Sequence, residues 1–451
     1  MKRALLQRPL CALLRIFFRR VQVTGQSHVP AGPVIFILNH PNALIDPLIL
    51  LCHTRRPVSF LAKEPLFRLP FIGQIVRAMD SIPVYRRMDQ ADTARNAATF
   101  AAARELLSRG GSLALFPEGT SHSDPRLKPF RTGVARIALG ARVPGLVIVP
   151  AGLFYTAKSR FRSQALLCFG PPVEVPETES GPDGESPTEP VREFTAELER
   201  SLGELTLQAD GHHALALAES AERILLSAGD GDRELGSRLQ IRRRLLEGYS
   251  QLKLTAPERL EEISRRVGAW QARLDAAGLT PELLPAGGYT AETVVRFTAP
   301  RLATLLGLFP LALLGTLIHL VPWVVVDLIG RRVRRSNLDL VSTVKILAGL
   351  VLYPLTWALL AWLSTRRWGL PAGLLILLLI PVSGFVALLF SEDLRRLLKG
   401  GRGLLFAITG KRRFLRLVAE RQAIRDDLVK LAEELQLDRP ASRRDPVVPL
   451  H

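Results

Sequence analysis

Short apolar runs alternate with amphipathic stretches through the first third of the chain. Apolar runs rich in strand-forming residues predict strands at residues 34–38, 82–85, 112–116 and 146–150. Apolar residues at helical spacing predict helices at residues 92–109 and 132–141. Alternating strands and helices indicate an α/β domain in which helices flank a sheet and polar loops follow the strands.

Beyond this domain the pattern becomes helical and then strongly apolar. Residues 171–190 are acidic and rich in Pro, Gly and Ser, which is typical of a linker or surface excursion. Amphipathic patterns predict helices at residues 191–207 and 214–274. Apolar stretches long enough to cross a hydrocarbon core follow at residues 302–326, 340–363 and 370–390. A buried helical bundle is the alternative to transmembrane helices, but three such stretches in series disfavour it.

The first apolar stretch differs from the other two. It contains Pro310, Gly315, His319 and Pro322, which suit a broken or re-entrant helix. If it crossed the membrane outward, the arginines at residues 331–335 would lie outside, against the positive-inside tendency. We therefore expect this stretch to enter the membrane and return on the same side, and the other two stretches to form a transmembrane hairpin.

These patterns divide the chain into five parts. They are an interfacial amphipathic helix at residues 1–20, the α/β domain at 21–210, a helical region at 211–298, a membrane domain at 299–392 and a basic cytosolic tail at 393–451. Arginines interrupt the apolar runs of the first part, which argues against a signal peptide. That helix either lies in the interface of an anionic membrane or packs on the following domain.

Composition adds charge and cysteine usage to this outline. The chain has 451 residues and a net charge of +18, so it needs an acidic partner: anionic lipid, a phosphorylated substrate or nucleic acid. Nucleic acid is disfavoured because no recognition motif places aromatic residues among the basic ones. Cys11, Cys52 and Cys168 are far apart and show no metal-binding spacing, so we expect free thiols, no disulfide and a reducing compartment.

The first candidate chemistry follows the strand at residues 34–38. His40 is followed by Asp46 in the segment NHPNALIDP. An imidazole with a nearby carboxylate can take a proton from a hydroxyl, while the carboxylate orients the ring and stabilises its cation. No Ser or Cys lies in a nucleophile-elbow pattern, so direct attack by a substrate hydroxyl on a thioester is the simpler mechanism. A single His after a strand is also commonly structural.

The second candidate follows the strand at residues 112–116. Glu118, Gly119 and Thr120 lie in the segment FPEGTSH, where a Gly turn can direct backbone N–H groups at an anion. Lys128 and Arg131 supply positive charge for a phosphate. Glu118 is expected either to accept a hydrogen bond from a substrate hydroxyl or to brace the loop.

In combination, these segments resemble the glycerolipid acyltransferase superfamily. The matching blocks are NHPNALIDP, the stretch from Ala62 to Arg86, FPEGTSH, and the residues Ile148, Val149 and Pro150. The resemblance implies an α/β acyltransferase domain with a mixed sheet flanked by helices. It also implies His40 and Asp46 as the catalytic residues and Arg86 as a ligand of glycerol phosphate. No metal and no cofactor is implied beyond acyl-CoA or acyl carrier protein as co-substrate.

The spacing within the first block departs from the family. His40 and Asp46 have five residues between them, where the family has four. Six positions on a continuous helix correspond to about 600°, so the two side chains would face apart and the extra residue must be absorbed in a turn. Pro41 and Asn42 suit such a turn, and Pro47 disfavours a helical Asp46.

The third block departs as well. Ser121 and His122 stand where the usual member has Arg-Ser, so we expect Arg131 to take over the role of the missing arginine. His122 could bind phosphate, act as the base, or make a structural hydrogen bond.

Both departures and the late apolar stretches look more like the fungal-type glycerol-3-phosphate and dihydroxyacetone-phosphate acyltransferases. That branch implies acylation of the first carbon of glycerol 3-phosphate or dihydroxyacetone phosphate. We also expect a multi-pass protein of the cell inner membrane, with the catalytic domain facing the cytosol because its acyl donor is a thioester, and with anionic lipids around it because of the net charge. A lysophospholipid such as lysophosphatidate is the alternative acceptor, and an inactive scaffold is the alternative class.

Overall fold

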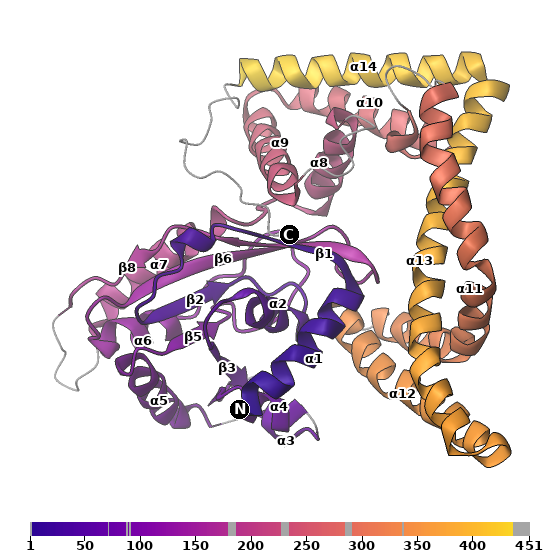
Figure 1. The fold of residues 1–451 in the computed structure, drawn as a ribbon. Helices are drawn as coiled ribbons and strands as arrows, with labels where there is room; N and C mark the ends of the chain where they lie inside the picture. Colours follow the sequence, from indigo (N-terminus) through magenta and orange to yellow (C-terminus); the bar gives the residue numbers. More distant parts are fainter. Residues whose placement is uncertain are drawn as a thin grey trace.

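The protein consists of an α/β unit, a group of helices beside it and a set of very long helices along one side (Figure 1). The computed structural model describes residues 2–435 except 71, 87–88, 90–91, 179–185, 227–233, 285–290 and 336–337. Residues 436–451 also lie outside the described part.

One mixed sheet of eight strands forms the centre of the α/β unit. The strands are β1 Phe18–Thr24, β2 Val34–Leu38, β3 Ser59–Lys63, β4 Ile82–Val84, β5 Ser112–Leu115, β6 Val147–Tyr155, β7 Ser163–Phe169 and β8 Val173–Glu174. Their order is β1-β7-β6-β2-β5-β3-β4, and β8 also pairs with β6. The pairs that β6 makes with β7 and β8 are antiparallel, and all other pairs are parallel. The four expected strands are present as β2, β4, β5 and the start of β6, whereas β1, β3, β7 and β8 were not predicted.

Helices cover both faces of this sheet, and β2 is buried on both sides. Alternate residues of a strand point to opposite faces, so Val34, Phe36 and Leu38 enter one core and Ile35 and Ile37 the other. Helices α1 Lys2–Phe17 and α2 Ile45–His53 cover the first face, and α5 Asn96–Ser108, α6 Gly133–Ala141 and α7 Thr188–Gly203 cover the second. The short helices α3 Pro65–Arg68 and α4 Ile72–Ala78 lie near β3 and β4.

Helix α1 packs on the α/β unit. Its Leu14 and Phe17 are buried in the core, and Gln7 Nε2 donates to the carbonyl of Leu51 on α2 at 2.7 Å. Cys11 and Cys52 form a disulfide between α1 and α2, so the expectation of three free thiols and no disulfide is wrong. No spacing pattern could predict this bond, because the two residues are 41 positions apart and meet only when the helices pack, with Cα atoms 5.5 Å apart. Cys168 remains a free thiol.

A second helical unit joins segments from both sides of the long apolar helices. It contains α8 His212–Leu225, α9 Leu235–Thr255, α10 Pro257–Ala276 and α14 Lys411–Glu434. Trp270 of α10 is fully buried, and its Nε1–H donates to the carbonyl of Leu417 on α14 at 3.0 Å. Part of the expected basic cytosolic tail at residues 393–451 thus belongs to long helices. Residues 393–409 continue α13, and the amphipathic α14 buries its apolar side in this unit.

Within the described residues, three helices are long and apolar enough to cross a membrane: α11 Ala291–Arg334, α12 Val341–Trp368 and α13 Leu370–Thr409. Much of their outward surface is apolar, and Leu306, Val321 and Leu378 are each more than two-thirds exposed. Such a surface is unfavourable in water and suits lipid. The short turn η6 Leu338–Leu340 precedes α12 and faces the α/β unit through Asp339.

The neighbours of α11 change half-way along it. As far as about Gly315, α11 packs on α13: Phe309 contacts Phe390, and the α-carbon of Gly315 packs against the carbonyl of Ser383. Around its middle, His319 Nε2 accepts a hydrogen bond from Trp357 Nε1–H of α12 at 3.0 Å. In its second half, Asp327 pairs with Lys345 at the start of α12. The helix thus runs toward the tip of the α12–α13 hairpin as far as about His319 and then away from it. Its re-entrant course in a membrane remains a prediction.

The side of the membrane on which Gly330 lies remains a prediction, and a fusion series tests it. A phosphatase that is active only outside the cytosol should stay inactive when it is fused after Gly330, because we expect α11 to return to its side of entry. The same reporter fused after Gly369, at the tip of the hairpin, should be active and serves as the control. Activity of the Gly330 fusion would show instead that α11 crosses the membrane.

Candidate active site

Three neighbouring parallel strands end at one place in the sheet. Strand β2 lies between β6 and β5 and is parallel to both, so their carboxyl ends meet at the same edge. Ligand sites of open α/β sheets lie outside such strand ends. Tyr155 ends β6, His40 follows β2, and Glu118 follows β5.

The turn after β2 absorbs the extra residue between His40 and Asp46. Ala43 has a φ of 33°, close to the left-handed region that non-glycine residues rarely adopt, and α2 begins at Ile45. Asp46 is therefore helical, so the expectation drawn from Pro47 is corrected. Pro47 lies in the first turn of α2, where a missing N–H costs no helical hydrogen bond.

This turn brings the His40 ring to the carboxylate of Asp46. The distance from His40 Nδ1 to Asp46 Oδ2 is 2.8 Å, and the ring stacks on Phe116 with a centroid separation of 3.9 Å. Because the ionised carboxylate can only accept, Nδ1 carries the hydrogen and Nε2 keeps its lone pair. Nε2 has no hydrogen bond to any described residue, and the side chain is 17% exposed.

Asp46 is fully buried and receives two further hydrogen bonds. The backbone N–H of Asn42 donates to Oδ2 at 2.7 Å, and the Tyr155 hydroxyl donates to Oδ1. Burial, together with the negative charge of Asp46, raises the pKa of Tyr155 well above its usual value, so the phenol remains a donor. Three donors together favour the ionised carboxylate that the imidazole needs.

Glu118 is also buried, and its two oxygens brace the surrounding loops. Oε1 accepts the backbone N–H of His40 at 3.1 Å, and Oε2 accepts the backbone N–H of Lys128 at 2.8 Å. His122 Nε2–H donates to Oε2, while His122 Nδ1 accepts the backbone N–H of Asp124 at 3.2 Å. Glu118 therefore braces these loops, which is one of the two roles expected for it, and its contact with a substrate hydroxyl remains a prediction. His122 is likewise held at both ring nitrogens, as a structural residue is.

Gly119 lies between two arginines. Arg86 Nη1 donates to the carbonyl of Gly119 at 2.6 Å, and a Cβ placed on Gly119 would come within 2.7 Å of Arg131 Nε. Glycine is needed here for this contact and because φ is +73°. The backbone N–H groups of Thr120 and Ser121 donate to no described residue. Two guanidinium groups and two unused N–H groups thus surround one turn, which is an arrangement that attracts an anion.

Arg86 also binds Asp89 in a bidentate pair, with distances of 2.6 and 2.8 Å. The hydrogen bonds from Arg86 lower the pKa of Asp89 below its usual range. The carboxylate therefore stays charged and competes with any anionic substrate for the same guanidinium.

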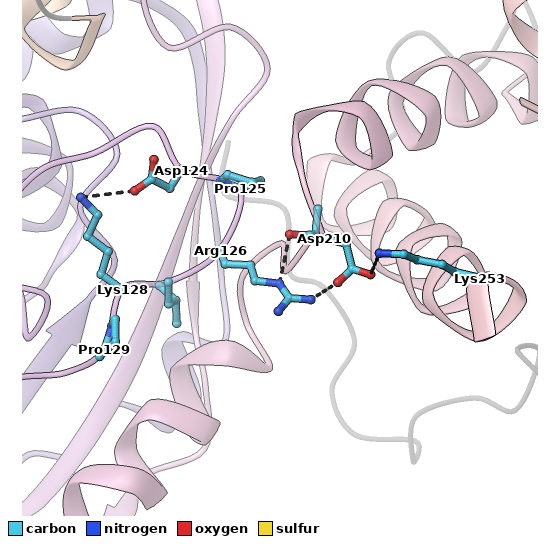
Figure 2. A pocket seen from close by; sticks show the side chains of 9 residues that line it. Asp124, Pro125, Arg126, Lys128, Pro129, Asp210 and Lys253 are labelled. Atoms are coloured by element: carbon cyan, nitrogen blue, oxygen red, sulfur yellow. Dashed lines mark hydrogen bonds and ion pairs between the residues drawn. The ribbon is translucent and has the colours of Figure 1, made fainter.

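The remaining two predicted residues are placed differently. The hydroxyl of Thr120 has only a long contact of 3.4 Å to the carbonyl of Ser121. The ammonium of Lys128 pairs with Asp124 at 3.2 Å and lines an open pocket of about 540 Å³ (Figure 2). Arg126 and Lys253 line the same pocket and both bind Asp210, so Lys128 belongs to a basic surface beside the anion turn.

Sequence reasoning missed Tyr155 and Asn42 as residues that hold Asp46. Pro150 ended the predicted strand five residues before Tyr155. Asn42 acts through its backbone N–H, which leaves no trace in the side-chain pattern. Within the described residues, no group of His, Cys, Asp or Glu is arranged to hold a metal ion.

Two family models match the chain. Residues 20–153 match the model described as Acyltransferase, and residues 220–437 match the one described as Glycerol-3-phosphate acyltransferase 2 C-terminal domain. The first match contains His40, Asp46, Arg86 and the Gly119 turn. The fold and this site therefore define an acyltransferase domain.

Individual relatives agree with both matches. The chain is 27% identical to glycerol-3-phosphate O-acyltransferase 2 of Saccharomyces cerevisiae over 297 residues, which cover 61% of this chain and 40% of the relative. It is 22% identical to glycerol-3-phosphate O-acyltransferase 1 of the same yeast over 447 residues, which cover 76% of this chain and 59% of the relative. A 1-acyl-sn-glycerol-3-phosphate acyltransferase of Borreliella burgdorferi is 31% identical over 137 residues, which cover 30% of this chain and 52% of the relative. The chain thus spans about half the length of these relatives.

Taken together, residues 20–153 form an acyltransferase domain, and the second match and the yeast relatives support the glycerol-3-phosphate acyltransferase branch.

Removing the Tyr155 hydroxyl tests whether the third donor to Asp46 matters. Tyr155→Phe should lower kcat about 10-fold and leave KM unchanged, because a hydrogen bond to a buried charge is lost. Since the raised pKa keeps the phenol protonated, the loss should be the same from about pH 6 to pH 9. Tyr249→Phe, in the distant α9, is the control. An unchanged kcat in Tyr155→Phe would show that the other two donors suffice.

Arg86 and Asp89 offer a matched pair of substitutions for the phosphate site. Arg86→Met should raise KM for a glycerol phosphate about 10-fold or more, because a charged ligand is lost. Asp89→Asn should lower KM, because it frees the same guanidinium. Steady-state kinetics with varied acceptor measures both. A KM that rises in both variants would mean that the pair only supports the loop.

Proposed function

We propose that the protein transfers a fatty acyl group from a thioester to a hydroxyl of glycerol 3-phosphate or dihydroxyacetone phosphate. The observation that carries this proposal is the His40–Asp46 pair beside the Gly119 turn. The unpaired Nε2 of His40 suits a base, and the turn with Arg86 and Arg131 suits a phosphate.

The reaction follows from these positions. As the acceptor hydroxyl attacks the thioester carbonyl, Nε2 of His40 takes its proton, and a C–O bond forms. Asp46 stabilises the imidazolium that results. The tetrahedral intermediate then loses its C–S bond, and the departing thiol takes the proton from the imidazolium. His40 is neutral again, and the acyl ester leaves.

The apolar helices support a location of this chemistry at a lipid surface, which suits a product with a long acyl chain. Acyl-CoA and acyl carrier protein are both proposed donors, because both present a thioester on an anionic carrier. The net charge of +18 favours such donors and an anionic bilayer. We further propose that the membrane is the cell inner membrane, with the α/β unit on the cytosolic side.

A histidine substitution tests the base. His40→Ala should reduce acyl transfer by about 10²–10⁴-fold, the range of general base catalysis. His53→Ala is the matched control, because His53 lies at the far end of α2 and its Nδ1–H donates to the carbonyl of Ile49. Both variants should insert into membranes as the wild type does. Near-normal transfer by His40→Ala would refute the assignment.

The second candidate function is acylation of lysophosphatidate. It is favoured by the 31% identity to the Borreliella burgdorferi relative, whose name gives that activity. Purified protein in vesicles with labelled acyl-CoA and one acceptor at a time separates the two functions. We expect the higher kcat/KM with glycerol 3-phosphate or dihydroxyacetone phosphate.

A further inference from the structure

The loop between β6 and β7 connects the α/β unit to the apolar helices at two points. Lys158 Nζ binds Asp339 Oδ1 at 2.6 Å, and Arg162 Nε binds Glu392 Oε1 at 2.5 Å. The four side chains are similarly covered, with exposures of 11–17%. Asp339 lies in η6 just before α12, and Glu392 lies on α13.

The two ion pairs differ in what else they hold. Lys158 Nζ also donates to the carbonyl of Pro41 at 2.8 Å and to Ser123 Oγ at 2.6 Å. Pro41 follows His40, and Ser123 follows His122, so the ammonium lies against both loops of the site. Arg162 instead donates to carbonyl groups at the end of α1.

A second connection runs through the backbone of Lys158. Its carbonyl accepts hydrogen bonds from Asn42 Nδ2 at 3.2 Å and from Ser342 Oγ of α12 at 2.5 Å. Asn42 is almost fully buried, and its own N–H is one of the three donors to Asp46. Helix α12, Lys158 and the turn that orients the catalytic carboxylate are therefore joined by consecutive hydrogen bonds.

We propose that Lys158 and Asp339 are positioning residues through which the seating of the apolar helices sets the geometry of the His40–Asp46 pair. A lysine ammonium has three N–H donors, and Pro41, Ser123 and Asp339 use all three. Without Asp339, the covered cation loses its counter-charge and moves toward water, because an unpaired buried charge is costly. Its hydrogen bonds to the two catalytic loops are then lost.

This inference rests on the proposed function but makes a separate claim. The proposed function requires only that His40 and Asp46 meet. The inference requires in addition that an ion pair outside the site, on the membrane-facing side of the protein, controls how well they meet. Small displacements of a catalytic group can cost about 10²-fold in rate.

The chain supplies a matched control for the test. Asp339→Ala and Glu392→Ala each remove one carboxylate from the apolar helices and one ion pair to the same loop. In vesicles, Asp339→Ala should lower kcat about 10-fold or more with KM for the acceptor within about twofold, whereas Glu392→Ala should keep both within about twofold. Equal losses in the two variants would overturn the proposal, because they would show general docking only.

Further variants address folding and coupling. Lys158→Met should match Asp339→Ala, and the double variant should be no slower than either single one. Losses that multiply in the double variant would contradict the coupling. Asp339→Asn keeps an acceptor oxygen without the charge and should lie between wild type and Asp339→Ala. If Asp339→Ala is poorly folded, Asp339→Asn can be compared with Glu392→Ala in its place.

A readout without turnover separates this proposal from the proposed function. The rate at which diethylpyrocarbonate modifies His40, followed by peptide mass spectrometry, should rise several-fold in Asp339→Ala and stay unchanged in Glu392→Ala. If wild type transfers no acyl group to any acceptor, the proposed function fails, and this rate still decides the coupling. An unchanged rate in Asp339→Ala would overturn it.

Discussion

The site depends on keeping one buried carboxylate charged. Removing Asp46 from water is unfavourable unless other donors replace the lost hydration. One of its donors is the ring that it orients, one is the turn after β2, and one is the end of β6. The turn after β2, the start of α2 and the end of β6 must therefore be in register before the histidine becomes a useful base. This requirement links the parallel pairing of β2 and β6 directly to the chemistry.

Glu118 is a second buried carboxylate with a different task. It ties the residue after β2 to the loop after β5, so the catalytic loop and the anion turn keep a fixed relation. The arginines around Gly119 are more exposed and remain accessible to a ligand. The buried carboxylate thus holds the loops of the site in place, while the more exposed guanidinium groups remain available to bind the substrate. The departure at Ser121 and His122 fits this division, because His122 joins the buried set and Arg131 the accessible one.

Continuous apolar runs made the central strands and the His40 and Glu118 loops predictable, because such runs are buried on both faces of the sheet. Strand β1 was missed because only two of its seven residues are buried, so polar residues interrupt its pattern. The continuation of β6 to Tyr155 was hidden by Pro150, since proline is rare within strands. The disulfide, and the packing of α14, depend on contacts between distant segments. Periodicity along the chain carries no record of such contacts.

The helical unit is completed by a helix that comes after the apolar ones. Trp270 and its neighbours on α8 and α10 lie under α14, which follows them by more than a hundred residues in the sequence. During synthesis the ribosome must therefore deliver α11, α12 and α13 to the bilayer before this core can close. Until then its apolar surface stays open, and truncation before Lys411 would leave it so permanently. Membrane insertion and the folding of this unit are thus ordered steps of one assembly process.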